Sequence, residues 1–230
     1  MKQCGLFLFL LVAVSVFAEE LPPAPQILAA VRAQLPPHPV FMSGTLKEWA
    51  PNGFMKKTKN VEMDLDWNAI PSTATYRIRD KKTKLFQTFE VQWVANEPVF
   101  HYSENGTKMA DFDPNTEISG LGVTWADLSF SFLWNSEAKT VATGKKMGRV
   151  CFILSVPRPE NHSLLIWVER KTGRLLGAEE QNKESKTEKI IKVVSVKDFD
   201  GLWMVKDLDV IQPAQGGRTS LRIDSVREVK

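Results

Sequence analysis

The chain has 230 residues, of which 43% are hydrophobic and 25% are charged, and its formal net charge is +3. This composition is typical of a globular protein and excludes a disordered or collagen-like chain. Lysine and arginine show no clustered excess of the kind that nucleic-acid-binding domains carry, so we expect no nucleic acid among the partners.

The first 18 residues have the features of a secretion signal. The chain is apolar from Gly5 to Phe17, and the small residue Ala18 stands at the expected cleavage point. This run is shorter than the roughly 20 apolar residues of a transmembrane helix, although an uncleaved anchor is the alternative. Cys4 precedes the run, whereas a lipid-attachment cysteine would follow it. We therefore expect a cleaved signal peptide, and a single unlipidated domain over residues 19–230.

A short helix is expected at the start of this domain. Ile27, Leu28, Val31 and Leu35 follow one another at spacings of one, three and four residues, which places them on one helical face. Two consecutive prolines at residues 36–37 cannot continue a helix, so it must end before them.

From Val40 onwards the hydrophobic period changes to two residues. Val61, Met63, Leu65 and Trp67 alternate with polar residues, which indicates a strand with one buried face. The same alternation returns in several later segments, and short turn sequences separate them. Such connections join antiparallel neighbours, because a parallel crossover needs a dozen or more residues. We expect a mainly β protein with a curved antiparallel sheet of about ten or eleven strands.

The residues between Gly122 and Trp134 interrupt this pattern with a helical period. Thr124 can cap the first turn together with Asp127, three residues later. The apolar residues that follow one another at helical spacing are Trp125, Leu128 and Phe132. We expect a second short helix here that touches apolar surface on more than one side.

The apolar face of such a sheet has to be covered. Two short helices cover too little of it, so we expect the sheet to curl on itself and to be incompletely filled. The remaining space would be an apolar cavity. The side chains expected to line or cover this cavity are Trp67, Phe89, Val91, Trp93, Trp125, Leu128 and Phe132.

The sequence offers little for catalysis. It has no HExxH, CxxC or GxSxG motif and no phosphate-binding loop. His38, His101 and His162 lie far apart, so a metal site has few residues to build from. Asp64 lies on the polar face of its strand, and Cys151 lies in an apolar stretch where we expect a buried side chain. We expect no enzyme activity, no cofactor and no metal.

Several strings resemble the LolA-like group of bacterial outer-membrane lipoprotein-sorting proteins, in its broad and less characterised branch. These strings are GVTWADLS at residues 122–129, GRVCFILSVP at residues 148–157 and WVERKTG at residues 167–173. The carboxy-terminal segment over residues 199–223 and the order of elements fit the same group. The resemblance covers essentially the whole chain after the signal. It implies an unclosed antiparallel β-barrel that is capped by helices and holds acyl chains.

Three hypotheses about function follow. The leading one is a periplasmic carrier or receptor that binds a lipid, or the acyl chains of a lipoprotein, in outer-membrane lipoprotein sorting, with envelope membrane proteins as further candidate partners. The main alternative is a non-catalytic envelope interaction module whose tryptophans only fill the core. The third is an enzyme that uses scattered residues.

Overall fold

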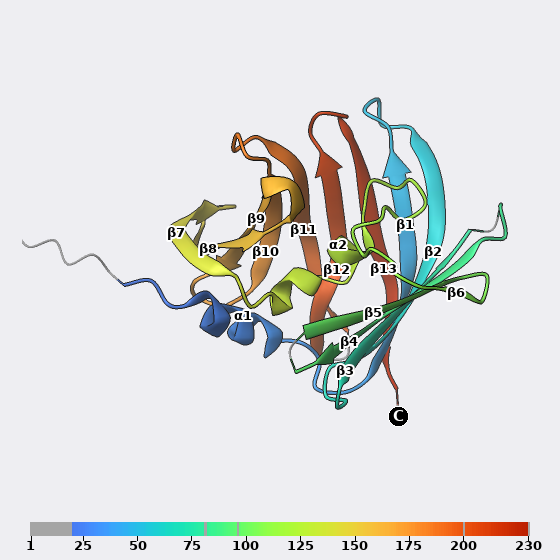
Figure 1. Cartoon of the computed structure of the whole chain (residues 1–230), viewed down its shortest axis with the longest axis horizontal. Helices are drawn as coiled ribbons and strands as arrows, with labels where there is room; N and C mark the ends of the chain where they lie inside the picture. The colour runs from blue at the N-terminus through green and yellow to red at the C-terminus, as the bar shows by residue number, and fades with distance from the viewer. Residues whose placement is uncertain (1–19, 81, 96, 200, 230) are drawn as a thin grey trace, which may run out of the picture.

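One continuous antiparallel sheet dominates the computed structural model, which describes residues 20–80, 82–95, 97–199 and 201–229 (Figure 1). The described residues form thirteen strands in the spatial order β6-β5-β4-β3-β2-β1-β13-β12-β11-β10-β9-β8-β7. The strands are β1 (Val40–Trp49), β2 (Met55–Asp66), β3 (Ser72–Arg79), β4 (Phe86–Val94), β5 (Glu97–Glu104), β6 (Thr107–Met109), β7 (Lys139–Lys146), β8 (Arg149–Pro157), β9 (Ser163–Glu169), β10 (Leu175–Gln181), β11 (Thr187–Phe199), β12 (Leu202–Gln212) and β13 (Gly217–Glu228). The expected mainly β architecture is confirmed.

The strand count exceeds the expected ten or eleven for two visible reasons. Strand β6 has only three residues, all exposed, so it is too short to show an alternating pattern. Strand β7 alternates between exposed and half-buried positions and has no buried apolar face. Both lie at the two edges of the sheet, and in the described residues they do not pair with each other, so the barrel stays open.

The first strand joins the two halves of the sheet, because β1 pairs with β2 on one side and with β13 on the other. The register between β1 and β13 shifts at Ser43 and Gly44, which is a β-bulge. A Cβ atom at Gly44 would lie 2.2 Å from the carbonyl oxygen of Arg222, so only glycine fits there. Bulges of this kind increase the local twist, which helps the two halves curl toward each other.

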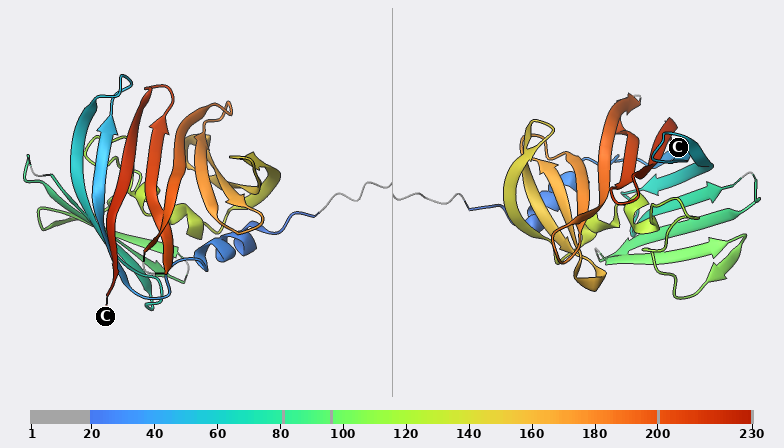
Figure 2. Two further views of the ribbon diagram at one scale, coloured as in Figure 1. Left: turned by 180° about the vertical axis from the view of Figure 1, so that it is seen from behind. Right: turned by 90° about the horizontal axis from the view of Figure 1, so that it is seen from above.

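Four short helical segments accompany the sheet: α1 (Ala24–Arg32), α2 (Trp125–Leu128) and the 3₁₀ turns η1 (Ser131–Trp134) and η2 (Pro159–Asn161), all within the described residues. In α1 the side chains of Ile27, Leu28 and Val31 are buried, as the spacing predicts, whereas Leu35 lies beyond the end of the helix. Viewed from above, the two halves of the sheet curl around α2 (Figure 2).

The second helical segment differs from the single helix expected between Gly122 and Trp134. The capping box of Thr124 and Asp127 is present. The helix nevertheless ends at Leu128, because Phe130 has a φ of 51° in the left-handed region, and the 3₁₀ turn η1 starts after it. Phe132 therefore belongs to a separate turn and does not continue the helical stripe of Trp125 and Leu128.

Candidate functional site

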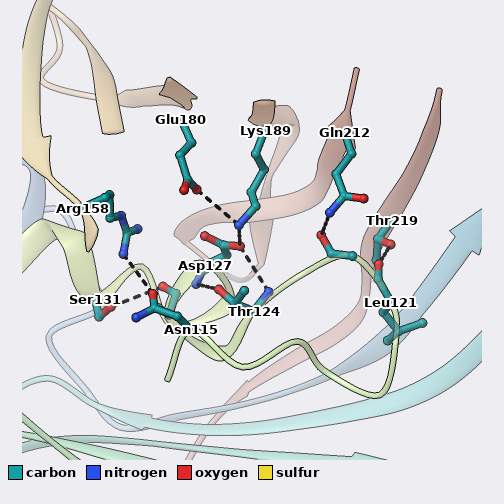
Figure 3. Close-up of polar contacts among 12 residues, drawn as sticks. Asn115, Leu121, Thr124, Asp127, Ser131, Arg158, Glu180, Lys189, Gln212 and Thr219 are labelled. Atoms are coloured by element: carbon teal, nitrogen blue, oxygen red, sulfur yellow. Dashed lines mark hydrogen bonds and ion pairs between the residues drawn. The ribbon is translucent and has the colours of Figure 1, made fainter. Parts of the chain in front are cut away.

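The connection between β6 and β7, residues 110–138, runs across the concave face of the sheet and carries α2 and η1 (Figure 1). We call it the crossing segment. Its backbone carbonyls accept hydrogen bonds from the sheet beneath it: Thr219 donates its hydroxyl to Leu121, and Gln212 donates its side-chain amide to Gly122 (Figure 3). These bonds hold the segment against β12 and β13.

A partly buried group of charges fixes α2 above β10 and β11. The Lys189 ammonium lies 2.9 Å from a carboxylate oxygen of Asp127 and 3.3 Å from one of Glu180 (Figure 3). Asp127 is only 1% exposed. Burial by itself would lower the pKa of Lys189, but the charges of Asp127 and Glu180 outweigh it, and the pKa lies above its ordinary value. The ammonium is therefore charged at neutral pH and compensates the buried carboxylate.

The far end of the crossing segment is held by α1. Arg32 donates a hydrogen bond of 2.5 Å to the carbonyl oxygen of Leu133, and its guanidinium lies 5.8 Å from the centre of the Trp134 ring. The crossing segment is thus attached to α1 at one end and to the sheet in its middle.

Between the crossing segment, α1 and the sheet lies a cavity of about 560 Å³. Most of its lining is apolar. From the sheet come Met42, Met63, Leu65, Tyr76, Val193, Val205, Leu221 and Ile223, and Trp67 follows directly after β2. From the crossing segment come Leu128, Phe130, Leu133 and Trp134, and from α1 and the residues after it come Val31 and Leu35. The volume falls in the range of roughly 300–1,000 Å³ that small-molecule sites occupy.

Two of the seven residues expected at such a cavity, Trp67 and Leu128, line it. Trp93 lies one layer behind: its ring centre is 5.0 Å from that of Trp67 and 4.2 Å from that of Trp134. Phe132 is buried and lies outside the lining.

The remaining three expected residues lie in a second aromatic layer. Phe89 and Val91 are fully buried, and the Phe89 ring centre is 5.2 Å from that of Trp125. Trp125 faces a different space, an open basin of about 930 Å³ that is lined by many polar residues, among them the Lys59 and Asp80 ion pair.

Sequence reasoning missed most of the lining. Met63 and Leu65 belong to the same alternating run as Trp67, and Leu221 and Ile223 share the alternation of their own strand, so the sequence did carry a signal for these four residues. Periodicity identifies every inward-facing residue, however, and does not tell which of them border empty space.

Other kinds of site find little support. No three His, Cys, Asp or Glu side chains of the described chain gather where they could hold a metal ion. The Cys151 side chain is buried, and burial raises the pKa of its thiol, so it has little thiolate character. Among the described residues, no helix has the length and apolar character that crossing a membrane requires.

Comparison with known proteins gives no match among protein-family models or among curated proteins. Solved structures do match. A DUF1329 family protein from Desulfovibrio piger superposes with a TM-score of 0.68 at 11% identity, over 89% of this chain and 91% of that chain. A LolA superfamily protein from Nitrosomonas europaea gives a TM-score of 0.67 at 12% identity, over 91% of this chain and 95% of that chain.

The fold is LolA-like. A putative outer membrane lipoprotein-sorting protein domain from Vibrio parahaemolyticus gives a third match, with a TM-score of 0.66 at 11% identity over 89% of this chain and 91% of that chain. The LolA-like resemblance of the sequence is therefore confirmed for the architecture. At this level of identity the comparison extends to the fold, and function has to be argued from the cavity.

Proposed function

We propose that this protein is a periplasmic carrier or receptor that binds a lipid, or the acyl chains of a lipoprotein, in the cavity beneath the crossing segment. The observation that carries the proposal is the apolar space of about 560 Å³ in the concavity of a LolA-like sheet. Burying acyl chain there contributes roughly 0.8 kcal/mol per methylene group, so ordinary apolar side chains suffice and no special motif is needed.

Binding and release in this proposal involve no catalytic step. Of the seven residues expected at the cavity, two would touch the ligand directly, namely Trp67 and Leu128. The other five, Phe89, Val91, Trp93, Trp125 and Phe132, would shape the cavity from the layers behind it. Export through the signal at residues 1–18, which lie outside the described residues, would bring the protein to the compartment where lipoproteins are sorted.

The alternative, an envelope interaction module with a filled core, predicts that the cavity has no ligand. We would test the two with a monoacylglycerol that carries a fluorescent chain, because its head group is uncharged and its binding reports on the apolar cavity alone. The carrier proposal predicts saturable binding. If the probe binds this protein no more tightly than it binds an unrelated β protein, the carrier proposal is contradicted and the interaction module becomes the leading hypothesis.

A matched pair of variants locates the binding. Val205 is half-buried and lines the cavity, so Val205→Trp should fill part of the space and weaken binding. Val141 is an exposed apolar residue on β7 outside the lining, so Val141→Trp adds the same ring without affecting the cavity. Equal binding by both folded variants would place the probe elsewhere. Mass spectrometry of organic extracts from natively purified protein would identify a co-purified ligand.

A further inference from the structure

The charges along the cavity all have one sign. Arg149 and Arg174 line it, and none of the Asp, Glu or Lys residues that the structure describes does. Arg149 is the first residue of β8, after the β7–β8 turn, and Arg174 is the last residue before β10. Both arginines are exposed, so they lie where the cavity opens to solvent.

The two arginines differ in the contacts that their guanidinium groups make within the protein. Arg149 donates to both carboxylate oxygens of Glu169, at 3.1 and 3.0 Å, and Glu169 also accepts the hydroxyl of Thr172. Arg174 donates no side-chain hydrogen bond to another described residue. Its guanidinium instead lies 5.8 Å from the centre of the Trp203 ring. Because Arg149 and Thr172 already occupy the Glu169 carboxylate, the donors of Arg174 are available to a ligand.

Exposed apolar side chains surround the same opening. Trp203 is 59% exposed and Met147 is 60% exposed, and both line the cavity. Val194 and Val196 of β11 are also exposed there. The cavity thus runs from a buried apolar interior to an opening that combines apolar surface with the Arg174 guanidinium, whose hydrogen-bond donors have no partner among the described residues. A fully neutral ligand would offer no negative group to interact with this guanidinium.

We propose that the preferred ligand is an anionic amphiphile whose acyl chain fills the cavity and whose carboxylate or phosphate head group is bound by Arg174. This inference rests on the proposed function and specifies its ligand class. A guanidinium can bind either group through two parallel hydrogen bonds, which adds orientation as well as affinity. Head group and chain would then enter the site in one fixed direction.

The test uses three ligands with the same palmitoyl chain: palmitate, palmitoyl lysophosphatidic acid and monopalmitoylglycerol. Each displaces a neutral fluorescent probe, at low salt and below the concentration at which micelles form. We expect the anionic ligands to bind about tenfold more tightly than the neutral one, since charge-assisted hydrogen bonds exceed neutral ones. Comparing palmitate with the lysophosphatidic acid tells which anionic group is preferred.

Two variants assign the preference to its residue. Arg174→Gln should remove the advantage of the anionic ligands and leave monopalmitoylglycerol unchanged. Lys171→Gln is the control, because Lys171 is exposed in the same turn but does not line the cavity. An anionic advantage that shrinks in high salt fits a head group close to solvent.

The inference is overturned if the neutral ligand binds as tightly as the anionic ones, or if Lys171→Gln has the same effect as Arg174→Gln. Failure of the proposed function looks different, because then none of the three ligands displaces the probe. Since Arg174 is exposed, we expect its variant to fold, and circular dichroism checks this.

Discussion

Lys189 of β11 forms an ion pair with Asp127 of α2, with 2.9 Å between the ammonium and a carboxylate oxygen, although the two residues are 62 positions apart in the chain. The same Asp127 carboxylate caps the first turn of α2 through the backbone N–H of Thr124. One buried side chain therefore serves both the local helix and its attachment to the sheet. This contact is one of several that hold the crossing segment over the cavity.

Asp127→Asn should destabilise the protein by about 2–3 kcal/mol, somewhat less than the usual loss for breaking a buried pair because Glu180 remains beside Lys189. The substitution keeps the size of the side chain and an oxygen for the cap. Urea denaturation measures the change. The control is Asp64→Asn, which removes a partly exposed ion pair with Arg77 and should cost below about 1 kcal/mol. Equal losses in the two variants would contradict the structural role of Asp127.

His162 should titrate above its ordinary pKa of 6.5, because Glu188 forms a hydrogen bond with its imidazole at 3.1 Å. The raised pKa means that the contact stabilises the folded state fully below pH 6.5 and loses this effect as the pH rises through the folded-state pKa. NMR titration of the imidazole measures the pKa of His162. Glu188→Gln should lower the midpoint, and Glu184→Gln, an exposed neighbour, should leave it in place. If Glu188→Gln leaves the titration midpoint of His162 unchanged, the pairing of His162 with Glu188 is contradicted.

Substitutions at Phe132 and at Trp67 should have different effects, the first mainly on stability and the second mainly on ligand binding. Phe132 is 3% exposed and lies outside the cavity lining, so Phe132→Ala should cost about 3–5 kcal/mol of stability. Trp67 is half-buried and lines the cavity, so Trp67→Leu should weaken acyl-probe binding by about tenfold through lost apolar contact. Thermal unfolding and probe titration of both folded variants provide the comparison. Stronger loss of binding in Phe132→Ala would mean that Phe132 contacts the ligand.

The exported chain is predicted to begin at Glu19, since the expected cleavage follows Ala18. A single domain should unfold in one transition. Because Cys151 is then the only cysteine, the chain has no internal disulfide and reductant should not change this transition. Intact mass and calorimetry with and without reductant test this. A mass that includes the first 18 residues would restore a membrane anchor, and two separate transitions would contradict the single domain.

Several features of the protein follow from short stretches of sequence. The alternation of Val61, Met63 and Leu65 selects the buried face of β2, and the Thr124 and Asp127 spacing selects the start of α2. The first follows from the alternation of side chains between the two faces of a strand, and the second from hydrogen bonds within one helical turn. Both are set by local chain geometry, so the sequence pattern predicts them directly.

Only the tertiary structure decided the site. The left-handed backbone of Phe130 ends the expected helix, and no local signal marks it. Which inward side chains border the cavity depends on how far the open sheet curls and where the crossing segment lies. The meeting of Lys189 with Asp127, and of Arg174 with Trp203, joins elements that are distant in the chain. Contacts of this kind arise from packing of whole elements, so the periodicity of any single element does not contain them.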